Sequence, residues 1–215
     1  RIGYDPWLHT REWVKEATKA LAERGAELVA VDSNPIDAIW SDHPTPSLAK
    51  LTAYPDSAAG RSSADKRQEI ADWLATRKAD AVVLSALDSI AWAFNIRGTD
   101  VMHTPVALSY AIVHADGTAD LFVAPDKMDE TVTQHLGNAV RVHDRAGFGD
   151  ALKGFSGKRV AADPERAVAA IFDSLDEGGA KILSVRDPVV LAKALKNPAE
   201  IAGHRAAQNR DGAAI

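Results

Sequence analysis

The sequence predicts an α/β fold, with a mixed β-sheet flanked by helices. Two observations lead to this prediction. Amphipathic helical segments alternate with short apolar runs along the chain, and one pair of strand-like runs is joined by an Asp-Gly turn. Alternating helices and strands favour parallel pairing, whereas a tight hairpin makes its two strands antiparallel. The sheet should therefore contain both kinds of neighbour.

The first part of the chain is predicted to contain a helix and then a strand. The helix spans residues 10–24 and ends at Gly25, because glycine is favoured just past a helix C-terminus. A short apolar strand follows at residues 28–31. Two prolines lie within residues 42–47, and such a segment favours a domain boundary.

The next segment repeats the order of helix and strand. A helix is predicted over residues 62–78, where Ser62 can cap the N-terminus and an acidic residue follows three positions later. Residues 81–84 form a buried strand, and residues 88–94 form a short amphipathic helical turn. Residues 95–100 are predicted to be a loop.

The centre of the chain carries the hairpin. Two β-rich runs at residues 106–113 and 119–123 flank residues 114–118, which contain Asp-Gly, a strong hairpin signal. A short helix is predicted at residues 130–136 and another strand at residues 139–142.

The last part returns to alternating elements. Asp-Pro-Glu at residues 163–165 predicts a helix start, with an Asp cap and Pro at the first helical position, and the helix should end at Gly178. A strand follows at residues 181–185. Asp-Pro at residues 187–188 and Asn-Pro at residues 197–198 each predict a further helix, the second with a capping pair.

Composition excludes several classes of protein. The 215 residues suffice for one or two domains, and the net charge of −5 comes without a basic stripe, which argues against nucleic-acid binding. No apolar run approaches the roughly 20 residues that span a bilayer. The absence of cysteine excludes disulfides, thiolate nucleophiles and zinc–thiolate sites, and fits a reducing compartment such as the cytoplasm.

Nucleotide and metal motifs are incomplete. Gly147 begins a G-x-G-x-x-G-like run, but leucine stands at the last position, where the phosphate-binding turn needs glycine. Asp100 and His103 are close enough in sequence to share a metal or to form an orienting dyad. The alternative, a loop acid and a surface histidine, is the commoner arrangement. Glu200 and His204 lie one helical turn apart and are expected to be a solvated pair.

The 95–100 loop is the most specifically built polar stretch. It combines Asn95, Arg97, Gly98 and Asp100 directly after apolar residues, and polar groups on a loop held by a rigid scaffold are typical of binding sites. In the alternative interpretation, Arg97 and Asp100 pair with each other or with a neighbouring domain, and Gly98 supplies a turn with positive φ. The residues by themselves favour this alternative.

The five tryptophans fall mostly at apolar helical positions, which favours packing in the core or between domains. They are Trp7, Trp13, Trp40, Trp73 and Trp92.

Four stretches of the sequence resemble the three-domain Xaa-Pro aminopeptidases (aminopeptidase P). Residues 85–113, SALDSIAWAFNIRGTDVMHTPVALSYAIV, resemble the second domain of that family. IGYDP at residues 2–6 resembles the end of the first domain, and IWSDHP at residues 39–44 resembles the domain junction. KNPAEIAG at residues 196–203 and RDGAA at residues 210–214 together resemble the opening helix of the catalytic domain. Two residues depart from the family pattern: His43 stands where the junction often has Arg, and Gln208 stands where the opening helix often has His.

The resemblance implies a creatinase N-terminal-like fold and a division into three parts. Residues 1–43 would end the first creatinase-type domain, residues 44–190 would form the second, and residues 191–215 would be the linker and first helix of the catalytic pita-bread domain. The chain begins with Arg and its last helix lacks a stop signal, so we expect the middle piece of a longer protein.

The resemblance also implies an activity for the whole protein. Family members are dinuclear metallopeptidases with two divalent ions, usually manganese, and they remove the N-terminal residue from peptides with proline in second position. The metal ligands (two Asp, one His and two Glu) lie in the pita-bread domain beyond residue 215. We therefore expect no catalytic residue and no metal ligand in this piece, which would be catalytically silent.

The expected role of the piece is to hold the domains, and the homodimer of the full-length protein, together. Its partners would be the rest of the same chain, a second copy and the peptide substrate. Substrate contact, if any, would come from Asn95, Arg97, Asp100 and His103. The alternative is a stand-alone creatinase-like binding or interaction module without peptidase activity.

Overall fold

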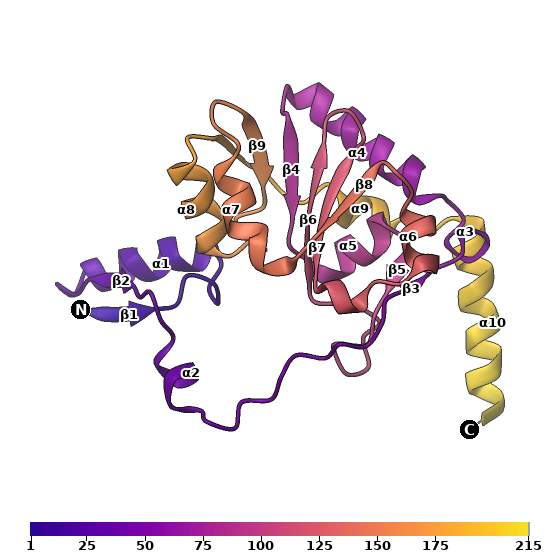
Figure 1. Cartoon of the computed structure of the whole chain (residues 1–215), viewed down its shortest axis with the longest axis horizontal. Helices are drawn as coiled ribbons and strands as arrows, with labels where there is room; N and C mark the ends of the chain where they lie inside the picture. The colour runs from indigo at the N-terminus through magenta and orange to yellow at the C-terminus, as the bar shows by residue number, and fades with distance from the viewer. Residues whose placement is uncertain (215) are drawn as a thin grey trace.

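The computed structural model, which describes residues 1–214, is built around one six-stranded sheet (Figure 1). The strand order is β10-β9-β4-β6-β7-β8. The strands are β4 (Ala81–Leu84), β6 (Ser109–His114), β7 (Ala119–Val123), β8 (Val140–His143), β9 (Arg159–Ala162) and β10 (Lys181–Ser184). Strand β6 runs antiparallel to both its neighbours, and the other neighbouring pairs are parallel. The mixed sheet predicted from the sequence is confirmed.

Helices cover both faces of the sheet. The helices that cover it are α4 (Ser63–Arg77), α5 (Leu87–Ala93), α6 (Glu130–Leu136) and α9 (Val189–Ala194) on one face, and α7 (Phe148–Lys153) and α8 (Ala169–Glu177) on the other. In β4, Val82 and Leu84 point to the first layer, whereas Ala81 and Val83 point to the second. All four residues are buried, because successive side chains of a strand alternate between two covered faces.

The N-terminal segment forms a small unit with a two-stranded sheet of its own. Strands β1 (Ile2–Tyr4) and β2 (Leu28–Ala30) pair in parallel and are connected by α1 (Arg11–Ala22). The Thr10 hydroxyl accepts a hydrogen bond from the Trp13 amide and caps the helix. Gly25 follows the helix with φ +69°, in the left-handed region that the sequence predicted for a glycine terminator.

A long connection leads from this unit to the main sheet. Helix α2 (Pro35–Ile39) is followed by an extended segment that runs to β3 (Thr52–Ala53), as Figure 1 shows. Strand β3 pairs antiparallel with β5 (Ile96–Arg97), so the predicted 95–100 loop contains a short strand. The remaining short elements are α3 (Asp56–Ala59) and the 3₁₀ turns η1 (Pro125–Lys127) and η2 (Arg145–Gly147).

The last helix, α10 (Pro198–Ala214), begins with the predicted capping pair and extends away from the sheet (Figure 1). The Asn197 Oδ1 accepts from the Glu200 amide at 3.0 Å, and the Glu200 carboxylate accepts from the Asn197 amide at 3.0 Å. The Asn197 side chain also donates to the Ala59 carbonyl at 2.8 Å. This contact attaches the start of α10 to the end of α3.

Two predicted boundaries are wrong. The helix predicted to start at Asp163 begins at Ala169. The Asp163 carboxylate accepts hydrogen bonds from the amides of Glu165 and Asp187, and it stabilises a turn instead of a helix start. The strand predicted from residue 106 begins at Ser109. The carbonyls of Pro105 and Val106, just before it, accept hydrogen bonds from the amides of Gly98 and Asp100 instead of pairing in the sheet.

The tryptophans of the N-terminal part lie outside the core formed by residues 1–214, and their packing between domains stays a prediction. Trp7, Trp13 and Trp40 are 41%, 43% and 45% exposed, whereas Trp92 is buried. Only Val14 of α1 is buried, so the apolar positions of this helix are not matched by a core within residues 1–214. In the same residues, no helix combines the length and the apolar character needed to cross a membrane.

Replacing Asn197 by alanine should loosen the start of α10. The variant loses the reciprocal cap and the bond to Ala59, and loss of a cap costs about 1 kcal/mol. Amide hydrogen exchange at Glu200 and Ile201 should therefore accelerate about fivefold. Gln208→Ala, an exposed change in the same helix, is the control. Unchanged exchange at the helix start would show that the cap does not hold it.

Candidate functional site

Asn95, the first of the predicted site residues, is fully buried and lies at the centre of a polar network. Its backbone has φ +48°, and its side-chain oxygen accepts from Lys66 Nζ at 2.6 Å. Its amide nitrogen donates to the Asp56 carboxylate at 2.9 Å and to the Arg61 carbonyl at 2.8 Å. The three contacts join α5 and β5 to α3 and α4, and they use the hydrogen-bonding groups that a ligand would need.

Lys66 is the buried cation of this network. The residue is 2% exposed, donates to the Trp92 carbonyl at 3.1 Å, and places Nζ 4.4 Å from the centroid of the Trp92 ring. Burial lowers the pKa of the ammonium group to about 8, because a charged amine loses its hydration there. Its acceptors are two oxygens and an aromatic face, so the group is satisfied within the protein.

Arg97 does not pair with Asp100. Its guanidinium donates to the carbonyls of Ala91 at 2.9 Å and Ile96 at 2.8 Å, and lies 4.1 Å from the centroid of the Tyr54 ring. Gly98 is required for close approach rather than for positive φ. A Cβ at this position would lie 2.7 Å from the Ala107 Cβ.

Asp100 belongs to a second buried network. Its carboxylate accepts from Lys127 Nζ at 2.6 Å and from the Leu108 amide at 2.7 Å, and the two side chains of the ion pair are 1% and 3% exposed. Lys127 also donates to the Ala49 carbonyl at the end of the long connection. His103 lies on the exposed turn that follows, with φ +61°. The structure therefore divides the four predicted residues among separate places: three make internal contacts and one is exposed.

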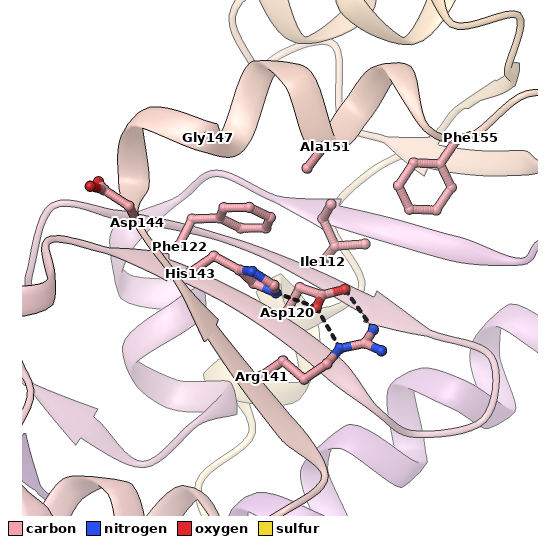
Figure 2. Close-up of a pocket in the computed structure, with 9 residues that line it drawn as sticks. All are labelled: Ile112, Asp120, Phe122, Arg141, His143, Asp144, Gly147, Ala151 and Phe155. Atoms are coloured by element: carbon pink, nitrogen blue, oxygen red, sulfur yellow. Dashed lines mark hydrogen bonds and ion pairs between the residues drawn. The ribbon is translucent and has the colours of Figure 1, made fainter.

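A further cluster lies in a hollow of about 540 Å³ between α7 and the β6–β7–β8 part of the sheet (Figure 2). Asp120, on β7, accepts hydrogen bonds from residues on both neighbouring strands. His114 Nε2 lies 2.6 Å and His143 Nε2 lies 2.7 Å from its carboxylate, and Arg141 contacts both oxygens at 2.8 and 3.0 Å. Burial alone would raise the pKa of Asp120, but these bonds hold it well below the usual range.

The hollow combines this ion cluster with aromatic walls. The His143 ring stacks on Phe122 at 5.0 Å, and Phe122, Ile112 and Phe155 face the same space in Figure 2. The carboxylate is bonded to three side chains, and among residues 1–214 no serine, threonine or tyrosine lines the hollow. The arrangement is therefore a clamp across three strands rather than a catalytic dyad.

Sequence reasoning missed this cluster. The signal that could have found it is strand register: Asp120 pairs with Arg141 across β7 and β8, and Phe122 pairs with His143. Residues two apart on a strand share a face, so Arg141 and His143 both reach the same carboxylate.

The residues described here do not fit the two divalent ions that the family resemblance implies. Within residues 1–214, no group of three or more His, Asp or Glu side chains could hold a metal ion. In the Asp120 cluster, both histidine nitrogens and Arg141 point directly at the carboxylate, so its oxygens are already neutralised.

The sequence profile of the creatinase/prolidase N-terminal domain matches residues 42–200. The chain therefore belongs to the creatinase/prolidase N-terminal domain family. This match confirms the fold class predicted from the sequence and agrees with the mixed sheet and its helices. The matched residues include the six-stranded sheet, the helices on both its faces, and the polar networks of Asn95 and Asp100.

Two relatives of this creatinase/prolidase-type chain carry the name of one kind of peptidase. It is 36% identical to a "Probable Xaa-Pro aminopeptidase P" from Aspergillus clavatus and 37% identical to one from Aspergillus niger, in each case over its whole length. The chain covers 34% and 36% of these proteins, so it spans about a third of the curated relatives it matches.

A solved structure gives the same relationship. The X-prolyl aminopeptidase from Caenorhabditis elegans, described as a cytosolic enzyme with a di-nuclear active site, superposes with a TM-score of 0.85 and 27% identity. The superposition covers 95% of this chain and 34% of the worm enzyme. The resemblance to Xaa-Pro aminopeptidases is thus confirmed in sequence and in structure.

Replacing Asp100 by asparagine should destabilise the fold by about 3–5 kcal/mol, because it leaves the Lys127 ammonium buried without a counter-charge. Urea unfolding measures the loss. Asp126→Asn, an exposed change in the same 3₁₀ turn as Lys127, should have little effect. The double variant D100N/K127M should recover part of the loss, and a double variant less stable than D100N would contradict the argument.

Lys66 predicts a specific pH dependence of stability. Its pKa is lowered in the folded state, so between pH 8 and 10.5 the unfolded chain binds more protons at this site than the folded protein. The stability of the wild type relative to Lys66→Met should therefore rise across this window, by up to about 3 kcal/mol. Gln68→Met, which removes no titrating group, should run parallel to the wild type. Parallel curves for Lys66→Met as well would show that Lys66 keeps its ordinary pKa.

Proposed function

We propose that this chain acts as the N-terminal-domain part of an Xaa-Pro aminopeptidase and that peptide hydrolysis is carried out by residues outside it. The observation that carries the proposal is the alignment of the whole chain with one third of the Aspergillus relatives. The C. elegans enzyme supports it, because its structural match covers the same share of that protein.

The proposed role of the chain is to hold the domains and the homodimer of the enzyme together. We retain the division into residues 1–43, 44–190 and 191–215 as part of this proposal. The contacts between these parts support it. Arg11 forms an ion pair of 3.0 Å with Asp173 on α8, and the start of α10 is bonded to Ala59.

The proposal extends to the chemistry of the complete protein. Its substrates would be peptides with proline in second position. It would use two divalent ions, which we propose to be manganese, and the ligands of these ions would lie outside the 215 residues. The description of the worm enzyme as di-nuclear and cytosolic supports two metals and a cytoplasmic location. In this proposal, the internal contacts of Asn95, Arg97 and Asp100 serve the framework rather than the substrate.

A chimera tests the proposed function. This chain replaces the matching third of the A. clavatus protein, and the chimera is assayed on Ala-Pro-Ala and Ala-Ala-Ala with manganese. We expect cleavage of Ala-Pro-Ala and much slower cleavage of Ala-Ala-Ala, whereas the 215-residue chain alone should give no turnover above buffer. A folded chimera that does not cleave Ala-Pro-Ala would contradict the proposal, as would turnover by the chain alone.

A further inference from the structure

Two helices of this chain begin against each other, one in the N-terminal unit (residues 1–40) and one beside the main sheet. They are α1 and α8, and Figure 1 shows α1 below α8. Thr10 and Val168, which directly precede the two helices, form an antiparallel β-bridge. We call this contact, formed by residues 5–12 and 163–173, the cap joint.

Each helix of the cap joint is capped by the loop in front of the other. The first amides of a helix have no partners within the helix itself. Here the first two amides of each helix donate to carbonyls of the opposite loop, in the same pattern in both directions. The four bonds are Arg11 N–H to Ala167 O (3.1 Å), Glu12 N–H to Pro164 O (2.9 Å), Ala169 N–H to His9 O (2.8 Å) and Ala170 N–H to Pro6 O (3.0 Å).

The two loops that supply these carbonyls are built alike. Each begins with Asp-Pro directly after a strand, β1 in one unit and β9 in the other. One oxygen of each Asp carboxylate accepts from the amide two residues later, and the other accepts from the loop after the next strand. These bonds are Trp7 N–H to Asp5 Oδ1 (2.8 Å), Asn34 Nδ2 to Asp5 Oδ2 (3.2 Å), Glu165 N–H to Asp163 Oδ1 (2.9 Å) and Asp187 N–H to Asp163 Oδ2 (2.9 Å). Each loop is therefore held in shape by its own unit.

The cap joint carries the backbone contacts between the two units. Among residues 1–214, its four bonds are the only backbone hydrogen bonds that join residues 1–40 to residues 51–214, and residues 44–50 of the connection form none. Side chains add the ion pair of Arg11 with Asp173, and the Arg11 guanidinium lies 5.7 Å from the centroid of the Phe172 ring. The position of the N-terminal unit is thus set at the cap joint and not by the connection.

The start of α8 depends on this contact more than the start of α1 does. The Thr10 hydroxyl accepts from the third amide of α1, whereas Val168 offers no side-chain acceptor to α8. If the N-terminal unit moves away, the first two amides of α8 lose their acceptors. Helix α8 packs through Ile171 and Phe172 on the same apolar layer as β9 and β10, so fraying of its first turn reaches the edge of the main sheet.

We propose that the cap joint couples the N-terminal unit to the main sheet, so that the starts of α1 and α8 open and close together as one cooperative unit. A partner or ligand that displaces the N-terminal unit would then also loosen the first turn of α8. The coupling rests on contacts within this chain, so it does not depend on the aminopeptidase assignment.

Amide hydrogen exchange followed by NMR tests the coupling, because it reports the opening of single amides. Glu12→Pro removes one donor on the α1 side, and proline is tolerated in the first turn of a helix. We expect exchange at Ala169 and Ala170, on the other side of the joint, to accelerate about fivefold. Glu12→Ala keeps the amide, and Thr131→Pro places proline at the same position of α6, so neither control should change these two amides.

A side-chain variant tests the same coupling without a change in the backbone. Asp173→Asn removes the ion pair with Arg11, and all four donor amides of the cap joint should then accelerate by one common factor of about three. Asp176→Asn, an exposed change in the same helix, is the control. Circular dichroism checks that each variant is folded.

Two results would overturn the proposal. One is unchanged exchange at Ala169 and Ala170 in folded Glu12→Pro, which would show that the two helix starts open independently. The other is equal exchange in Asp173→Asn and Asp176→Asn, or acceleration that is confined to one side of the joint.

Discussion

The hydrogen bond between Lys66 and Asn95 is the constraint on which the centre of this structure depends. A buried ammonium group is stable only where acceptors replace its water, and the Asn95 oxygen, the Trp92 carbonyl and the Trp92 ring do so here. Asn95 in turn reaches α3 through Asp56. These contacts fix the chain where it leaves α5 and enters β5, and they set the path of the segment that follows.

The buried pair of Asp100 and Lys127 continues this construction at the other end of the segment. Together the two networks hold residues 95–100 against α3, α4 and η1, with Gly98 packed directly on Ala107. The polar side chains of Asn95, Arg97 and Asp100, which resemble a ligand site in the sequence, are thus bonded within the domain. The Asp120 hollow remains accessible on the α7 side of the sheet.

Local chemistry made most of the fold predictable from sequence. The Asp-Gly turn at Gly117 and the reciprocal cap of Asn197 and Glu200 depend on neighbours within a few residues, and both are present. The Asp163 helix start failed because a distant amide, that of Asp187, competes for the same carboxylate. The partners of Asn95 and Asp120 were equally out of reach, because they come from strands and helices whose register is set by the whole sheet.

We propose that residues 95–100 brace this creatinase/prolidase-type domain and do not touch the substrate of the complete protein. The most direct measurement is Arg97→Ala in the Aspergillus chimera, with the melting temperature and the KM for Ala-Pro-Ala determined on the same preparation. Removing the contacts of Arg97 with Ala91, Ile96 and Tyr54 should lower the melting temperature by several degrees and leave KM near the unsubstituted value. A rise of about tenfold in KM with an unchanged melting temperature would contradict the account.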